Sequence, residues 1–169
     1  MKSALAASIL LAALTSSLPA AAPNIVVILA DDLGWADLGC YGNTFNETPN
    51  IDRLATGGVS FDYAFDVTSS CSPSRATYIT GQYPHTHGLT GLSHRFPELA
   101  LPAGYQTLPA LLQEAGFYTA LQGKWDVANW APVEGYGYDE FLNLIPVTLY
   151  IQSSENAIAY IESHRGEPF

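Results

Sequence analysis

The sequence predicts an α/β fold with a mainly parallel sheet flanked by helices. Apolar, β-branched stretches alternate with segments whose apolar residues recur at helical spacing, a pattern typical of parallel sheets. The chain has 169 residues, of which 48% are apolar and 13% are charged. This length corresponds to one domain of about 100–200 residues, and the composition excludes an intrinsically disordered polyanion.

The strands are predicted from residue type, and the helices from spacing and end signals. Residues 24–30 (NIVVILA) are apolar and rich in β-branched residues, which indicates a strand buried on both faces. Thr48 and Pro49 suit the cap and first position of a helix, and Gly116 suits the end of another. The other expected elements, in chain order, are a helix at 51–55, a strand at 59–64, a helix from Ser72 to Thr80, a helix at 107–115, a strand at 117–121 and a helix at 154–164.

Residues 1–22 have the layout of a secretory signal peptide. Lys2 precedes an apolar stretch, residues 4–14, and small residues follow up to Ala22. The apolar stretch is shorter than the ~20 residues of a membrane span. We therefore expect cleavage near Ala22, no stable membrane span, and a secreted, periplasmic or lumenal product. Because the pattern stops after a helix, where another strand would begin, we expect residues 23–169 to form an incomplete sheet, the front part of a larger protein.

The charge composition excludes two classes of partner. Lys and Arg number 6 against 16 Asp and Glu, which gives a net charge of −10. So few basic residues argue against nucleic acid and against anionic membrane surfaces as partners. The 2 cysteines are too few for a scaffold built on disulfides.

Two adjacent carboxylates, Asp31 and Asp32, follow the first predicted strand. Ligands of open α/β sheets bind at the carboxyl ends of the strands, and a hard divalent cation, Ca²⁺ or Mg²⁺, would relieve the repulsion between these side chains. The alternative is a simple turn before Gly34, with one carboxylate capping the next segment.

The segment Cys71-Ser72-Pro73-Ser74-Arg75 is the most informative stretch. Pro73 predicts the start of a helix just after Cys71, where amide donors and the helix dipole favour an anion, and Arg75 adds a cation one turn in. Unmodified, Cys71 could be a thiol of low pKa. A structural disulfide between Cys71 and Cys40 is a second alternative.

This segment, followed by ATYITG, resembles the Cys-x-Pro-x-Arg…Thr-Gly signature of the type I sulfatases, which depend on formylglycine and belong to the alkaline-phosphatase-like superfamily. Residues 24–43 and 48–65 resemble the family's first strand, metal-binding aspartates and first helix, and residues 108–125 resemble its following helix and strand. Residues 81–96 lean toward the heparan N-sulfatase-like and bacterial branches. The resemblance implies that residues 23–169 are the N-terminal part of a sulfatase catalytic domain.

The resemblance also implies roles for individual residues. Cys71 would be oxidised by a separate formylglycine-generating enzyme and become the catalytic residue, and Asp31 and Asp32 would bind Ca²⁺ (Mg²⁺ less so) together with it. Arg75 would hold the formylglycine hydrate, and Lys124 would contact the sulfate.

The implied reaction is hydrolysis of a sulfate ester or sulfamate of a sulfated small molecule or glycan. One hydroxyl of the hydrate attacks sulfur and displaces the alcohol, and the other expels sulfate as the aldehyde re-forms. Cationic groups stabilise the charge on the sulfate oxygens.

Two features depart from the family pattern. Asp126 stands where members commonly have a substrate-contacting His after Gly-Lys-Trp, and a carboxylate there ought to weaken sulfate binding unless protonated or turned away. His85, His87 and His94 are candidates to replace that His, or ordinary loop histidines.

The second departure is length, because family members supply further metal ligands from later positions. Ca²⁺ takes 6–8 oxygens, so we expect the chain as it stands to bind metal weakly and to turn over poorly or not at all. The alternatives are a phosphonate or phosphate ester hydrolase of the same fold, and a non-catalytic, truncated relative that binds metal or glycan.

Overall fold

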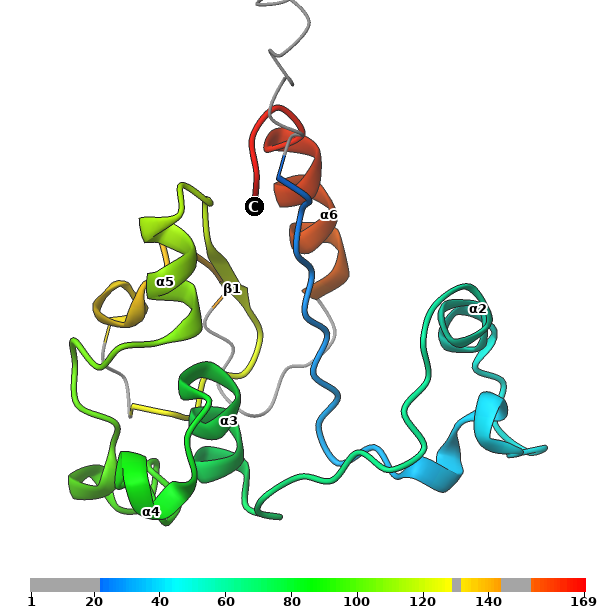
Figure 1. Ribbon diagram of the computed structural model, residues 1–169, viewed down its shortest axis with the longest axis horizontal. Coiled ribbons are helices and arrows are strands. Elements are labelled where there is room, and N and C mark those ends of the chain that lie inside the picture. Colours follow the sequence, from blue (N-terminus) through cyan, green and yellow to red (C-terminus); the bar gives the residue numbers. More distant parts are fainter. Residues whose placement is uncertain (1–21, 129–131, 144–152) are drawn as a thin grey trace, which may run out of the picture.

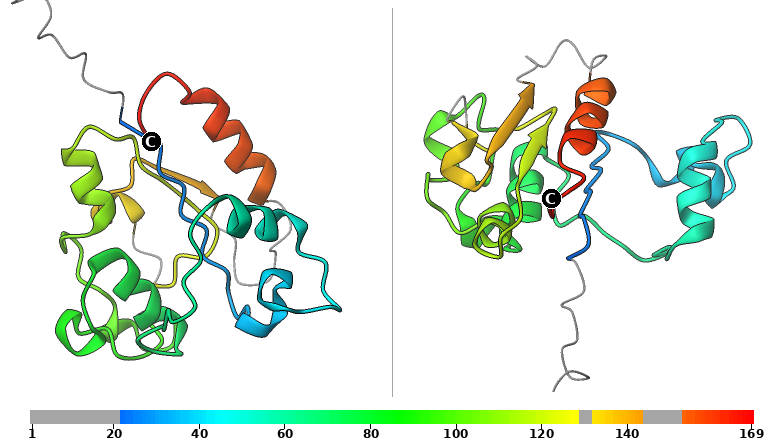
Figure 2. Two further views of the ribbon diagram at one scale, coloured as in Figure 1. Left: turned by 45° about the vertical axis from the view of Figure 1, so that its right-hand side comes forward. Right: turned by 90° about the horizontal axis from the view of Figure 1, so that it is seen from above.

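The computed structural model describes residues 22–128, 132–143 and 153–169, and the predicted signal peptide lies almost entirely outside them. Two regions differ in packing. Residues 22–69, the N-terminal region, contain no buried residue, whereas residues 70–143, the core region, contain every buried hydrophobic side chain of the described part. Figures 1 and 2 show α2 (Pro49–Gly57) standing apart from the core region.

The N-terminal region begins as an extended segment and then forms short helices. Its helical elements are η1 (Trp35–Asp37), η2 (Gly39–Tyr41) and α2. Thr48 lies at the N-cap position of α2, as expected, but its hydroxyl accepts a hydrogen bond from the Gly39 amide (2.8 Å) and donates one to Asp52 (3.0 Å) rather than capping the helix. These bonds tie η2 to α2.

The core region places helices around a small sheet. Its elements are α3 (Cys71–Thr80), α4 (Pro84–His87), η3 (Pro97–Leu99), α5 (Leu108–Glu114), β1 (Ala120–Gln122), η4 (Val133–Tyr136) and β2 (Glu140–Asn143). α6 (Ser153–Ser163) follows and packs against both strands. Among these residues, no helix is both long and apolar enough to cross a membrane.

β1 and β2 are parallel neighbours. Ala120 pairs with Glu140 and Leu121 with Phe141, and the register shifts before Gln122. A parallel pair requires a long crossover connection, and here that connection includes η4. The α/β class and the parallel pairing predicted from the sequence are therefore confirmed.

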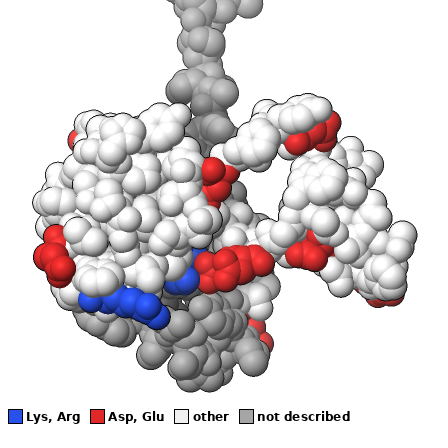
Figure 3. Space-filling model, turned by 90° about the horizontal axis from the view of Figure 1, so that it is seen from below, with Lys and Arg blue, Asp and Glu red and all other residues white. Residues whose placement is uncertain are grey.

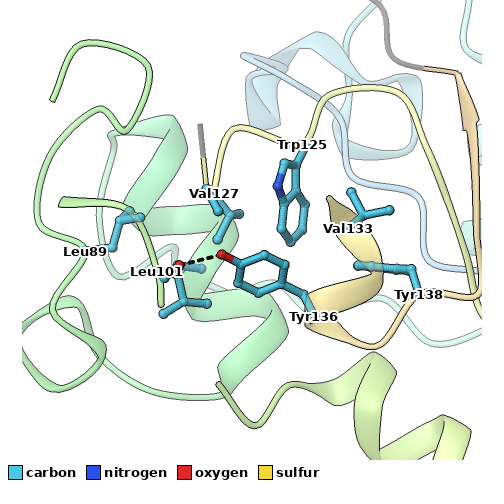
Figure 4. Close-up of a cluster of buried hydrophobic side chains, with 9 residues drawn as sticks. Leu89, Leu101, Trp125, Val127, Val133, Tyr136 and Tyr138 are labelled. Carbon is cyan, nitrogen blue, oxygen red and sulfur yellow. Dashed lines mark hydrogen bonds between the residues drawn. The ribbon is translucent and has the colours of Figure 1, made fainter. Parts of the chain in front are cut away.

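The hydrophobic core combines aliphatic side chains with three aromatic ones, Trp125, Tyr136 and Tyr138 (Figure 4). The Trp125 ring packs edge-on against Tyr136 and Tyr138, with ring centroids 5.1 and 5.9 Å apart. The buried Tyr136 hydroxyl donates to the Leu101 carbonyl at 2.6 Å. Trp125 thus belongs to the core, and its packing holds the backbone of the preceding residue, Lys124, in place.

Two predicted strands are wrong. Residues 24–30 are extended but belong to no strand ladder of the described residues, and all of them are exposed. Val27 is 74% exposed and Ile28 is 80% exposed. A strand buried on both faces needs neighbours at its edges and layers on its faces. Among the described residues, this segment makes a single backbone hydrogen bond of that kind, which the Ile25 amide donates to the Phe169 carbonyl (2.7 Å). Residues 59–64 form turns and irregular backbone for the same lack of a partner.

The other elements agree more closely with the sequence. Helices lie at all four predicted places, with α2 extending past the expected 51–55 at both ends. The strand predicted at 117–121 is present as β1, shifted toward its C-terminus. β2 was not predicted, because its sequence EFLN is short and lacks the β-branched residues that mark a strand.

Candidate active site

Cys71 is the first residue of α3, and local bonds fix this helix end. Ser70 is extended at the N-cap, and the Ser74 amide donates to its carbonyl (3.0 Å). The Ser74 hydroxyl donates to Asp66 (2.6 Å). Ser72 is fully buried. The helix start is thus held by its own motif, and the Cys71 side chain, which is partly buried, is presented at the edge of the core region.

Asp31 joins the N-terminal region to the core region. Its carboxylate accepts hydrogen bonds from Arg75 Nη2 (3.0 Å) and from Lys124 Nζ (3.1 Å to Oδ2). Arg75 Nη1 donates to the Lys124 backbone carbonyl (2.8 Å), which fixes the two cations relative to each other. Three residues distant in sequence therefore meet, all of them predicted site residues.

Lys124 and Asp126 project from the turn that follows β1. Gly123 has φ +93° and Asp126 has φ +52°. The first conformation suits glycine, whereas the second is a strained backbone for a residue with a side chain. The Asp126 side chain is 7% exposed, and its Oδ2 lies 3.9 Å from Lys124 Nζ. The turn directs both charged groups to one place beside Cys71.

Asp31, Arg75, Lys124, Asp126 and Cys71 form a cluster, and contacts within it shift several pKa values. Burial alone would raise the pKa of Asp31, but the hydrogen bonds from Lys124 and Arg75 lower it below its ordinary value. Burial would lower the pKa of Lys124, but the bond to Asp31 raises it. Burial and the neighbouring Asp126 raise the pKa of Cys71. Asp31 and Lys124 are therefore both charged near neutral pH.

Both alternatives for unmodified Cys71 disagree with the structure. The raised pKa contradicts the predicted low-pKa thiol, because the partly buried sulfur faces the Asp126 carboxylate, whose effect exceeds that of Lys124. Cys40 and Cys71 are both free, and Cys40 is exposed in the N-terminal region, so they form no disulfide. A protonated thiol is a poor nucleophile.

Asp32 is the predicted site residue that the structure leaves outside the cluster. Its side chain is exposed and makes no hydrogen bond with the described residues, although its backbone has φ +56°. Asp32 and Asp126 are the two non-glycine residues of the described part with positive φ. Such strain is concentrated at functional sites, and both residues were predicted from the sequence.

The predicted calcium ligands do not assemble into a complete site. Within the residues that the structure describes, no group of three His, Cys, Asp or Glu side chains is arranged to hold a metal ion. Both oxygens of Asp31 accept bonds from cations, and the Cys71 thiol faces Asp126 rather than Asp31 and Asp32. A set of Asp31, Asp32 and residue 71 falls short of the 6–8 oxygens that Ca²⁺ requires.

The three candidate histidines have different environments. His94 Nδ1 lies 2.8 Å from Asp126 Oδ1. His87 is buried and bonded to Thr77 (3.3 Å) and the Leu89 amide (3.2 Å), where burial lowers its pKa. His85 stacks on Tyr83. Only His94 of these three reaches the cluster.

Ser93 is a residue of this site that the sequence did not reveal. Its amide donates to Ser72 Oγ (3.1 Å) and its hydroxyl donates to the Asp126 carbonyl (3.0 Å). A lone serine in a loop carries no signal, because its role arises from two contacts distant in sequence. Figure 3 shows a small basic spot in direct contact with acidic side chains between the two parts of the molecule.

Comparisons with known proteins show which family the chain belongs to. The sulfatase family profile matches residues 23–165. Human steryl-sulfatase is 45% identical over 112 residues, 63% of this chain and 19% of that protein. N-acetylgalactosamine-6-O-sulfatase of Bacteroides thetaiotaomicron is 45% identical over 103 residues, 61% of this chain and 20% of that protein.

A solved structure gives the same result. Ps i-CgsB in complex with k-i-k-neocarrahexaose superposes with a TM-score of 0.65 at 32% identity, over 87% of this chain and 34% of that chain. The chain therefore belongs to the sulfatase family, as the motifs predicted, and it has the alkaline-phosphatase-like fold in part. It spans about a fifth of the length of the curated relatives it matches. The lean toward the heparan N-sulfatase-like branch stays a prediction.

Proposed function

We propose that this chain carries the nucleophile and the sulfate-binding cations of an enzyme that hydrolyses sulfate esters or sulfamates. The observation that carries the proposal is the convergence of Arg75 and Lys124 on one carboxylate beside Cys71. The proposal gives Lys124 the sulfate contact and Arg75 the contact with the modified residue 71. The relatives named for a steryl and for an amino-sugar sulfate support a sulfated small molecule or glycan as the substrate class.

The cations explain how an acidic chain would bind an anion. The net charge is −10, but Arg75 and Lys124 are largely buried, with side chains 12% and 18% exposed. Charges in a partly desolvated place interact more strongly than charges in water. A sulfate group that replaces the Asp31 carboxylate as the partner of Lys124 would be held by that cation, while Arg75 contacts the modified residue 71.

Conversion of Cys71 to formylglycine by a formylglycine-generating enzyme is part of the proposal. The raised pKa of the thiol supports it, because an unmodified Cys71 would be mostly protonated and weakly nucleophilic at neutral pH. Formylglycine supplies, as its hydrate, the attacking hydroxyl. Residue 71 is the first residue of α3, and the start of a helix favours an oxygen-rich or anionic group.

The binding of Ca²⁺ is proposed from the resemblance to the sulfatase family alone. Asp31, Asp32 and modified residue 71 would contribute some of its oxygen ligands, and no step is assigned to the ion. The signal-like residues 1–22 further support export to a secreted, periplasmic or lumenal location.

The experiment is hydrolysis of matched aryl sulfate, sulfamate and phosphodiester substrates by the full chain coexpressed with a formylglycine-generating enzyme. We expect turnover by this chain to be slow, with sulfate or sulfamate preferred, and we expect Cys71→Ala to abolish it. Cys40→Ala, which removes the exposed cysteine of the N-terminal region, is the control and should retain activity. A preference for the phosphodiester, or equal activity of Cys71→Ala, contradicts the proposal.

A further inference from the structure

His94 is the histidine that lies at the candidate site. Its Nδ1 is 2.8 Å from Asp126 Oδ1, and its side chain is 43% exposed. The chain has 4 histidines, and the other three are engaged elsewhere. His87 is buried with both ring nitrogens hydrogen-bonded, and His85 and His164 stack on tyrosines. Any imidazole chemistry at this site therefore belongs to His94.

The contact with Asp126 orients the His94 ring. A carboxylate accepts hydrogen bonds, so Nδ1 donates to it and Nε2 is the nitrogen left for another partner. Within the part of the chain that the structure describes, no hydrogen bond involves Nε2. The Asp126 side chain is only 7% exposed, which limits its movement. A partly exposed imidazole held by a buried carboxylate is the arrangement of a general acid or base.

The same carboxylate places His94 beside the cation that the proposed function assigns to sulfate. Asp126 Oδ2 lies 3.9 Å from Lys124 Nζ, while Oδ1 is bonded to His94. The ammonium group and the imidazole thus flank one carboxylate. A sulfate group held by Lys124 would therefore lie next to the His94 ring.

Two buried serines fix the loop that carries His94. The Ser93 amide donates to Ser72 Oγ (3.1 Å), and the Ser93 hydroxyl donates to the Asp126 carbonyl (3.0 Å). Both serines are fully buried. Because Ser72 lies in the first turn of α3 and Asp126 in the turn after β1, the loop is tied to both elements of the site.

We propose that His94 is the general acid of the reaction and that Asp126 is its positioning residue. The inference rests on the proposed function, because it assigns a proton transfer within the same reaction. When the bond between sulfur and the ester oxygen breaks, its electron pair goes to that oxygen, which takes the proton of His94 Nε2 and leaves as the alcohol. The attacking hydroxyl releases its proton to water, and His94 regains a proton from water. The Asp126 carboxylate stabilises the imidazolium before the transfer.

This assignment explains how an Asp at position 126 is compatible with an anionic substrate. A carboxylate beside the sulfate would repel it, but one oxygen is bonded to His94 and the other faces Lys124, so two cations offset its charge when His94 is protonated. The family commonly has a His at position 126. In this chain the imidazole comes from the loop instead, and Asp126 orients it.

The test compares two sulfate esters that differ in their need for an acid. 4-Nitrophenolate leaves readily without a proton, whereas the alkoxide released from 4-nitrobenzyl sulfate requires one. The full chain is coexpressed with a formylglycine-generating enzyme, and sulfate release from each ester is followed over long incubations. We expect His94→Ala to slow release from 4-nitrobenzyl sulfate by about 10²–10⁴-fold and release from 4-nitrophenyl sulfate by less than about threefold.

Two further variants separate proton transfer from a structural role. His94→Gln has an amide that can donate to Asp126 but cannot give up a proton, so it should show the same selective loss as His94→Ala. Asp126→Ala should also slow the 4-nitrobenzyl ester more than the 4-nitrophenyl ester, because the ring loses its orientation. Urea denaturation first confirms that each variant is folded.

His85→Ala is the matched control, because His85 stacks on Tyr83 and does not contact Asp126. It should hydrolyse both esters at the wild-type rates. Equal slowing of both esters by folded His94→Ala, no slowing of either, or wild-type rates in His94→Gln would overturn the inference alone. If the wild type carries the aldehyde and hydrolyses neither ester, the proposed function fails and the inference fails with it.

Discussion

The N-terminal region and the core region have similar apolar sequences but opposite packing. Residues 24–30 are among the most apolar of the chain, yet their side chains are exposed, whereas Trp125, Tyr136 and Val133 are at most 8% exposed. The difference lies in partners. The core region closes its own cluster, while the N-terminal region meets it mainly through Asp31. The candidate site lies at this junction, so one region supplies an acidic residue and the other supplies the cations.

The largest expected effect comes from the core cluster. Trp125→Ala should lower the free energy of unfolding by about 3–5 kcal/mol, because a buried ring that packs on Tyr136 and Tyr138 is removed. Val27→Ala, in the exposed extended segment, should change it by less than about 0.5 kcal/mol. Urea denaturation of the full chain measures both values. Similar losses for the two variants would contradict the difference in packing.

A smaller effect isolates one hydrogen bond of the same cluster. Tyr136→Phe removes the donor to the buried Leu101 carbonyl and should cost about 1–2 kcal/mol. Tyr63→Phe is the matched control, because Tyr63 is 87% exposed in the N-terminal region. It should leave the urea midpoint unchanged. A midpoint shift as large as that of Tyr136→Phe would contradict the exposure of the Tyr63 side chain in the N-terminal region.

The smallest effect concerns the junction. Asp31→Asn should lower stability at pH 7 by about 1 kcal/mol, since the pair is partly exposed and screened. The folded-state pKa of Asp31 lies below its ordinary value of 3.8, so its contribution is full above that pH and is lost as the pH falls through the lower, folded value.

The pH dependence of the junction has a clear control. The difference between wild type and Asp31→Asn should be constant from pH 7 to about pH 5 and shrink below the ordinary value of 3.8. Asp62→Asn, which changes an exposed carboxylate of the N-terminal region, should show no such difference. A gap between wild type and Asp31→Asn that widens on acidification would contradict the ion pairs.

Local signals in the sequence were sufficient for the helices and for much of the site. The Cys71–Arg75 motif sets its own helix start and could be located from its residues, whereas Lys124 was identified only through the resemblance to the sulfatase family. The strand predicted at 24–30 failed because burial depends on what lies beside a segment, which its own residues do not specify.

The charge partners could not be predicted either. Asp31 was predicted to bind a divalent metal ion, and its hydrogen bonds with Arg75 and Lys124 were not predicted. These two residues are too far from Asp31 in the sequence for residue spacing to indicate the contacts. The pairing of His94 with Asp126 likewise required the loop geometry to choose among three histidines. Most members of the site could thus be named from local sequence motifs, but the charge of their surroundings depends on contacts between residues distant in sequence.

The most direct measurement is the mass of the peptide that contains Cys71, from the full chain made in cells that have a formylglycine-generating enzyme. Conversion of the thiol to the aldehyde lowers the mass by about 18 Da, and this loss is the result that the account predicts. A peptide that retains its sulfur, in cells that convert a known sulfatase made alongside it, would contradict the hydrolase proposal and leave only family membership and fold.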